Sequence, residues 1–186
     1  MPPHLIRSAI FALCVTIFGC EPVAEMAYKG STDAPVFRAD QVRLPETPTD
    51  NIGLRVMAWN IKYGAGRIPF WFDCWGDRVQ LSKTELSENM RGIYALIQEA
   101  QPDVLMVEEI ELHSRRSNYF DMVQGILDNT DLNYAAYFET WNSRYVPSEG
   151  LGRMNLGNAI FSRHPILNAT RITQPDRTDL DFLTDI

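Results

Sequence analysis

Residues 54–61 read LRVMAWNI, and residues 104–110 form a second stretch of the same kind, VLMVEEI. Both are apolar on the two sides of an alternating pattern, which predicts internal strands covered by other layers. Between them, Ser82 and Glu85 have the spacing of a helix capping box, and apolar residues then recur with a helical period until Pro102. A strand, a helix and a strand in this order predict two parallel strands joined by a crossover. We therefore expect an α/β protein.

Polar residues close the two expected strands, Asn60 in the first and Glu109 in the second. Parallel strands end at the same edge of a sheet, and ligands of α/β sheets bind beyond that edge. Strict alternation places Asn60 on the face of Val56 and Ala58, and Glu109 on the face of Val107. A glutamate buried among apolar strands must be paired, protonated or bound to a cation, whereas one at an open strand end is commonly just solvated. The spacing leaves both interpretations open.

The composition is that of an ordinary globular chain. The protein has 186 residues, 45% of them hydrophobic, and a formal net charge of −7. Its three cysteines are too few for a disulfide framework, and Cys74 is expected to be a free thiol. The acidic balance disfavours sequence-independent binding to duplex nucleic acid, which requires a basic surface.

The first fifty residues are expected to lie outside the domain. Residues 1–20 have the pattern of a signal peptide, with Arg7 followed by an apolar run over residues 8–19 that rises only about 18 Å as a helix, too short to span a bilayer. The run closes on Cys20 as in a lipoprotein signal, although Phe18 stands where a small residue is usual, so ordinary secretion and retention of the segment stay open. Residues 21–52 have little apolar periodicity and several prolines, and are expected to form a tether. We expect an exported protein, which is either attached to the membrane through a lipid on Cys20 or located in the periplasm or outside the cell.

Three motifs that follow one another in the sequence together resemble those of a known protein family. They are VMAWNIKYG over residues 56–64, PDVLMVEEI over residues 102–110, and GNAIFSRHPI over residues 157–166. Together they resemble the endonuclease/exonuclease/phosphatase superfamily of metal-dependent phosphoesterases. The resemblance spans roughly residues 54–172. It implies that residues 53–186 form the N-terminal part of a four-layer α/β sandwich, in which two mixed sheets are flanked by helices.

The resemblance also implies roles for individual residues. Asn60 matches the family's asparagine near the scissile phosphate, which makes it a catalytic residue and a candidate metal ligand. Glu109 matches the glutamate that holds Mg²⁺ (or Mn²⁺), while Glu108 stands where the family usually has glutamine. The implied activity is hydrolysis of phosphodiester or phosphomonoester bonds. Nucleic acid, a phospholipid head group and an inositol phosphate all remain credible substrates, and no protein partner is evident.

The second half of the family's site has no match in the sequence. The family's His–Asp pair, Asp-x-Asn strand end and Ser-Asp-His segment are not found, and the histidines are His4, His113 and His164. We therefore expect this chain to fold poorly and to be inactive by itself, with exposed apolar surface where the second sheet of the sandwich would lie. The alternative is a non-catalytic exported lipoprotein that uses the fold as a binding module. A dinucleotide-binding fold is disfavoured, because the turn after the first strand lacks the glycine-rich fingerprint.

Smaller signals lie on the same edge of the expected sheet. The aromatic loop IPFWFDCWGDR, residues 68–78, could contact a ring or a lipid, although simple packing on the domain is favoured. After Glu109, a loop that contains Glu111, Arg115 and Arg116 is expected to be solvated, with an arginine–phosphate contact as the alternative. Tyr145 is a candidate for a position near the leaving group, and burial is equally acceptable for it.

Overall fold

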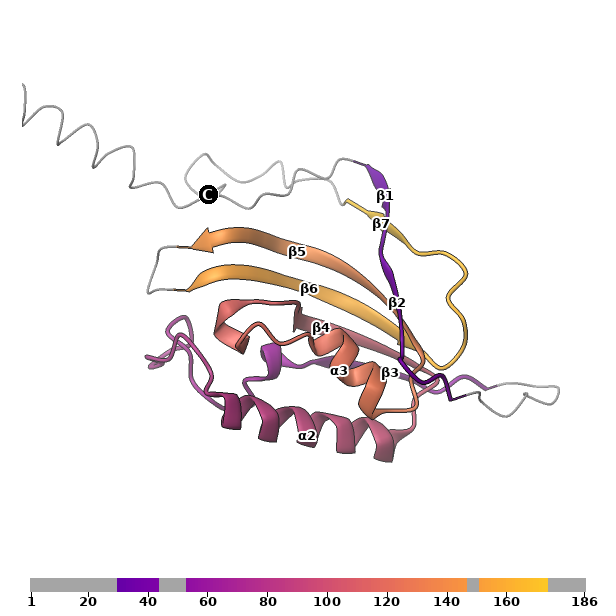
Figure 1. The fold of residues 1–186 in the computed structure, drawn as a ribbon, viewed down its shortest axis with the longest axis horizontal. Helices are drawn as coiled ribbons and strands as arrows, with labels where there is room; N and C mark the ends of the chain where they lie inside the picture. Colours follow the sequence, from indigo (N-terminus) through magenta and orange to yellow (C-terminus); the bar gives the residue numbers. More distant parts are fainter. Residues whose placement is uncertain (1–29, 44–52, 147–150, 174–186) are drawn as a thin grey trace, which may run out of the picture.

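The computed structural model describes residues 30–43, 53–146 and 151–173. Their elements follow one another along the chain as drawn in Figure 1: β1 (Ser31–Asp33), β2 (Val36–Arg38), β3 (Val56–Asn60), the short helix η1 (Lys62–Gly64), α2 (Lys83–Ala100), β4 (Val104–Glu111), the short helix η2 (Arg115–Ser117), α3 (Met122–Asn129), β5 (Tyr134–Val146), β6 (Gly152–Ser162) and β7 (Thr170–Ile172).

The main sheet has five strands in the order β2-β5-β6-β4-β3, and β1 pairs with β7 in a separate two-stranded sheet. Strands β3 and β4 run parallel, as expected for the strand–helix–strand unit, while β4, β6, β5 and β2 pair antiparallel in turn. The GNAIF stretch lies in β6, between β4 and β5. The α/β class and a mixed sheet with helices are therefore confirmed.

Helix α2 connects the two parallel strands and begins and ends where the sequence predicts. The Ser82 hydroxyl accepts a hydrogen bond from the Glu85 N–H (3.2 Å), and the Glu85 carboxylate accepts one from the Ser82 N–H (2.8 Å). This capping box satisfies two N–H groups of the first turn. At the other end, Gln101 adopts a left-handed conformation and closes the helix before Pro102.

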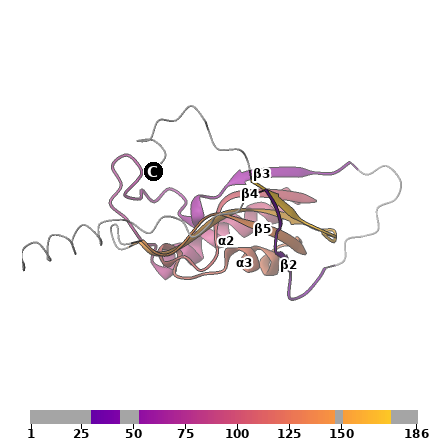
Figure 2. The ribbon, with the colours of Figure 1, turned by 90° about the horizontal axis from the view of Figure 1, so that it is seen from above.

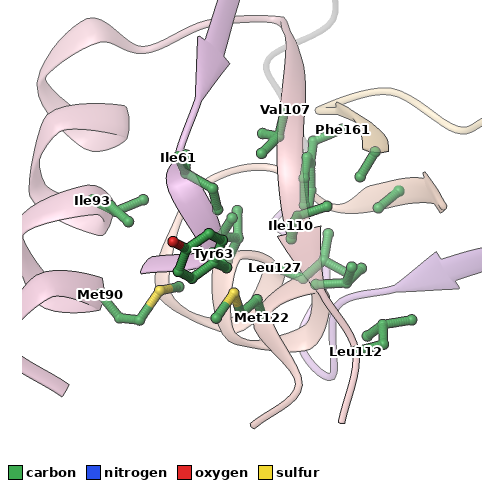
Figure 3. Close-up of a cluster of buried hydrophobic side chains, with 14 of the residues drawn as sticks. Ile61, Tyr63, Met90, Ile93, Val107, Ile110, Leu112, Met122, Leu127 and Phe161 are labelled. Carbon is green, nitrogen blue, oxygen red and sulfur yellow. The ribbon is translucent and has the colours of Figure 1, made fainter. Parts of the chain in front are cut away.

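The core lies between one face of the sheet and the two helices. Residues that alternate along β4 and β6, among them Leu105, Val107 and Phe161, are at most 1% exposed on this face. They belong to one cluster of buried side chains with residues of α2 and α3, such as Met90 and Met122 (Figure 3). Figure 2 shows both helices with the sheet from above.

The opposite face of the main sheet is exposed over strands β3, β4 and β6. A row that follows the strand register, Ala58 to Met106 to Ile160, crosses β3, β4 and β6 on this face. Met106 is 41% exposed and Ile160 is 39% exposed, and Val56 is likewise exposed. Apolar side chains are therefore exposed on this face, while the second sheet that would cover them stays a prediction.

Two expectations about the strands are wrong. Strand β3 is not internal, because it forms the edge of the sheet and only one of its faces is covered. Part of the expected tether, residues 21–52, belongs to the fold, since Val36–Arg38 pairs with Tyr134–Ala136 at the other edge of the sheet. Prolines interrupt a helix but are tolerated beside an edge strand. The proline near residue 35 therefore does not distinguish a tether from an edge strand. The expected signal peptide, residues 1–20, lies outside the described residues. Within the described ranges, no helix is long and apolar enough to cross a membrane.

Candidate functional site

The two predicted site residues meet at the common end of the parallel strands. The Asn60 side-chain Nδ2 donates a hydrogen bond to Glu109 Oε1 over 2.9 Å, although the two residues are 49 positions apart in the sequence. The Asn60 Oδ1 accepts a hydrogen bond from the Lys62 N–H at 2.9 Å. These two contacts determine the orientation of the amide, because a flipped amide would oppose its NH₂ to an N–H and its oxygen to a carboxylate. Asn60 is exposed and Glu109 is half-buried.

Glu109 reaches Asn60 through an irregularity in β4. The pairing of β4 with β6 shifts register between Val107 and Ile110, and Glu109 lies at this shift with a φ of 54°. In the regular part of the sheet Asn60 is opposite Glu108, so strict alternation would direct residue 109 to the opposite face, beside Val107. The bulge overrides that alternation and turns the carboxylate toward Asn60. The predicted pairing of Glu109 with the Val107 face is therefore wrong, whereas the predicted common edge is correct.

The chain also turns sharply after Asn60. Lys62, Tyr63 and Gly64 have φ values of 47°, 41° and 71°, so three consecutive residues are left-handed. For residues other than glycine this conformation costs about 1 kcal/mol or more each. Lys62 Nζ lies 2.6 Å from Asp73 Oδ2 and ties the turn to the aromatic loop. Its hydrogen bond holds the pKa of Asp73 below the ordinary value, with a further contribution from the Phe70 N–H.

Beside Asn60, the space between the end of β3 and helix α2 forms a hollow of about 450 Å³. Lys62 and Gly66 line it from the turn, and Glu88 and Asn89 line it from the helix. The Asn89 side chain donates a hydrogen bond to the Gly64 carbonyl (2.8 Å) and so fixes one wall of the hollow. The hollow is large enough for a small substrate group next to the candidate site.

The donor atoms at this edge suit a hard cation held by few protein ligands. Glu109 uses one carboxylate oxygen to accept from Asn60, and a carboxylate has acceptor positions on both oxygens. Mg²⁺ prefers oxygen ligands and is commonly bound by one or two carboxylates together with water and substrate phosphate oxygens. Within the part of the chain that the structure describes, no three His, Cys, Asp or Glu side chains cluster as a closed metal site would require. The residues present therefore fit Mg²⁺ or Mn²⁺ held mainly by Glu109. Asn60 fits the orientation of that carboxylate better than direct ligation.

The expected solvated loop after Glu109 is in part a buried ion pair. Glu111 is the last residue of β4 and is 0% exposed, and Arg116 is 3% exposed. Arg116 Nε lies 2.6 Å from Glu111 Oε1, and the Ser117 hydroxyl donates to Glu111 Oε2 over 2.6 Å. Burial raises the pKa of Glu111, while Arg116 and Ser117 oppose that shift. Arg116 is thus not free to bind a phosphate, and the interpretation of Glu111 and Arg116 as solvated residues is wrong.

Three other residues named from the sequence are exposed, and in the described part of the chain none of them is hydrogen-bonded to Asn60 or Glu109. His113 is exposed, with Nδ1 3.0 Å from the Tyr119 carbonyl oxygen and Nε2 3.9 Å from Asp121 Oδ2. Tyr145 lies near the end of β5 and is 61% exposed. Cys74 is a free, exposed thiol.

The aromatic loop divides into a buried and an exposed part. Phe70 is fully buried and packs edge-on against Tyr63, with ring centroids 5.0 Å apart. Trp75 is 98% exposed, and Trp71 and Phe72 are partly exposed. The loop therefore packs on the domain through Phe70, as favoured from the sequence, while its tip remains open.

Comparison with known proteins agrees with the motifs. The model of the Endonuclease/Exonuclease/phosphatase family matches residues 57–185, which is well over half of the chain. No curated protein matches the chain. Among solved structures, it is similar to an endonuclease/exonuclease/phosphatase from Beutenbergia cavernae DSM 12333, with 21% sequence identity and a TM-score of 0.33. The match covers 60% of this chain and 26% of that one, so the chain spans about a quarter of the length of that protein.

Proposed function

Because this chain belongs to the Endonuclease/Exonuclease/phosphatase family, whose members are hydrolases of the phosphoesterase and nuclease type, we propose that it carries the metal-holding part of a divalent-metal-dependent phosphoesterase site. The observation that carries the proposal is the 2.9 Å hydrogen bond between Asn60 and Glu109 at the ends of two parallel strands. Glu109 is assigned as the residue that holds Mg²⁺ or Mn²⁺, and Asn60 as the residue that orients its carboxylate.

Each residue has a defined part in this proposal. The bound cation would supply Lewis-acid polarisation of the phosphoryl group. The Glu109 carboxylate provides the negative charge that holds it, and its half-buried position strengthens that attraction relative to open water. The Asn60 NH₂ fixes one carboxylate oxygen and leaves the other to face the cation. The adjoining hollow, which includes Lys62 and Asn89, would receive part of the substrate.

The proposed substrate is a phosphate ester. The formal net charge of −7 disfavours long duplex nucleic acid, because Lys and Arg side chains must replace the counterions of the phosphates there. At the site itself, the Lys62 ammonium is already paired with Asp73. A small phosphate ester, such as a phospholipid head group or an inositol phosphate, is therefore favoured over a long polyanion.

The test of this proposal is Mn²⁺ binding to the 186-residue chain, followed by electron paramagnetic resonance of the free ion. We expect Glu109→Gln to weaken Mn²⁺ binding by tenfold or more, because the substitution removes the only charge assigned to the cation. The control is Glu99→Gln, at an exposed position near the end of α2. Equal Mn²⁺ affinity in the wild type and Glu109→Gln would refute the assignment.

Export and lipid attachment are proposed on the sequence pattern of residues 1–20. Cleavage before Cys20 with acylation would change the mass of the mature protein by an amount that mass spectrometry of the membrane fraction resolves. Cys20→Ala should release the protein from that fraction. Lipid attachment would be contradicted if the membrane-bound wild type lacked the mass of a lipid and Cys20→Ala stayed in the membrane fraction.

A further inference from the structure

A buried ion pair lies at the end of β4, close in sequence to Glu109. Glu111 lies two residues after Glu109, and both of its carboxylate oxygens have partners, Arg116 Nε and the Ser117 hydroxyl, each at 2.6 Å. A buried ion pair contributes little net stability, because the desolvation of both charges opposes their attraction. Stability therefore explains this ion pair only weakly, whereas in some proteins such a pair fixes one local arrangement of the chain.

Arg116 also contacts the segment that follows the other site residue. Its guanidinium carbon lies 3.5 Å from the centroid of the Tyr63 ring, a distance at which the cation attracts the face of the ring. Tyr63 is 1% exposed and three residues after Asn60, in the middle of the left-handed turn. One buried side chain thus touches residues that are close in sequence to Asn60 and to Glu109.

Both segments joined by Arg116 have backbone conformations that need support from their surroundings. Lys62 and Tyr63 are left-handed in the turn after β3, and Glu109 is left-handed near the end of β4. Non-glycine residues persist in this region only where neighbouring groups determine their conformation. The contacts of Arg116 with the Tyr63 ring and with the carboxylate of Glu111 supply such a link between the two segments.

We propose that Arg116 is a positioning residue, which holds the turn after β3 against the end of β4 and so keeps the Asn60 amide and the Glu109 carboxylate within hydrogen-bond distance. Through this pair it sets the affinity of the site for a divalent cation, a consequence that rests on the function proposed for Glu109. Arg116 itself touches neither the cation nor the substrate. Lysine cannot replace it, since an ammonium lacks the planar group that lies over Tyr63 while bonding to Glu111.

The experiment compares two variants that treat the buried charge differently. Arg116→Lys keeps the positive charge, and the double variant Glu111→Gln with Arg116→Met removes both charges, so that neither leaves a charged Glu111 without a charged partner. The control is Arg163→Lys, because Arg163 Nε donates to the Pro102 carbonyl at the other end of β4. Two quantities are measured for each protein: the NMR signals of the Asn60 side-chain amide without metal, assigned by their loss in Asn60→Asp, and the affinity for Mn²⁺.

We expect both Arg116 variants to unfold cooperatively in urea, and to shift the Asn60 amide signals toward those of a solvated asparagine. Their Mn²⁺ affinity should fall by about tenfold or more, as is typical when a group that orients a metal ligand is removed. Arg163→Lys should change neither quantity. Unchanged amide signals and Mn²⁺ affinity in both Arg116 variants would overturn the proposal. Loss of the cooperative transition in both would also overturn it, since the pair would then support the whole sheet.

The two proposals fail in distinguishable ways. If Glu109→Gln binds Mn²⁺ as tightly as the wild type, the function proposed for Glu109 fails, and the Asn60 amide signals still report whether Arg116 holds the pair together. If Glu109→Gln weakens Mn²⁺ binding while the Arg116 variants change neither the Asn60 amide signals nor the Mn²⁺ affinity, only the positioning role fails.

Discussion

The two faces of the main sheet predict opposite responses to truncation at neighbouring positions of one strand. Leu105 and Met106 are adjacent in β4, but Leu105 is 0% exposed against the helices and Met106 is 41% exposed on the open face. Their partners across the ladder repeat the contrast, since Phe161 is fully buried and Ile160 is 39% exposed. Truncation of each residue to alanine therefore measures how much each face contributes to stability.

The magnitudes follow from burial. Leu105→Ala removes atoms from a closed core and leaves a cavity, which costs about 2–5 kcal/mol. A fully buried methionine contributes about 1.5–3 kcal/mol, and Met106 is already 41% exposed with no enclosed space to leave behind, so Met106→Ala should cost about 1 kcal/mol. For a chain of this size, 1 kcal/mol corresponds to roughly 2–4 °C in Tm. We expect Tm to fall by about 10 °C for Leu105→Ala and by about 3 °C for Met106→Ala.

The assay is thermal and urea unfolding followed by tryptophan fluorescence at low protein concentration, which limits self-association through the open apolar face. Ile160→Ala and Phe161→Ala repeat the comparison on β6. Equal losses at Leu105 and Met106, independent of protein concentration, would contradict this expectation, because the second face would then have to be covered in solution.

Two further predictions concern particular backbone and charge contacts. Gly157→Ala should destabilise the chain by about 2 kcal/mol or more in urea unfolding, since its Cβ would lie 2.3 Å from a backbone carbonyl oxygen and 2.7 Å from the Tyr137 ring. Gly92→Ala in helix α2 should instead stabilise it by about 0.5–1 kcal/mol, because its Cβ would meet no atom within 4 Å beyond the backbone of its own helix. Similar effects of the two substitutions would contradict this account of their surroundings. The hydrogen bond from Arg78, together with that from the Ser82 N–H, lowers the pKa of Glu85 from 4.5 to about 2. The stabilising effect of the charged Glu85 is therefore complete above the unfolded value near 4.5 and is lost as the pH falls toward 2. The difference in free energy of unfolding between the wild type and Glu85→Gln should shrink over that range, and a constant difference would exclude the charge of Glu85 as its source.

The local elements were predictable from the sequence because their signals are local. The capping box of Ser82 and Glu85 and the apolar period after it specify α2 from its own residues. The order of strand, helix and strand then restricts β3 and β4 to a parallel pair. This pairing alone predicts that Asn60 and Glu109 lie at one edge of the sheet.

What could not be predicted depends on partners distant in the chain. An edge strand and an internal strand with the same apolar pattern differ only in their neighbours, so the sequence of β3 does not reveal that one face is open. The strand Val36–Arg38 is recognisable only through its pairing with β5, about a hundred residues later. Glu111 and Arg116 read as a polar loop, because nothing in their spacing reveals that each neutralises the other inside the core.

The bulge in β4 is not predictable from the alternating pattern, and it determines the position of the Glu109 carboxylate. Among the described strands, Glu109 is the only non-glycine residue with a positive φ. Glycine at this position would adopt the same backbone without the cost of a left-handed side chain, and would also allow the register shift. A glutamate there carries a strain of about 1 kcal/mol or more that the fold does not require. The strain is accounted for if the carboxylate is needed where the bulge directs it, toward Asn60 and the open edge of the sheet. The backbone geometry thus supports the assignment of Glu109 independently of the motif that first suggested it.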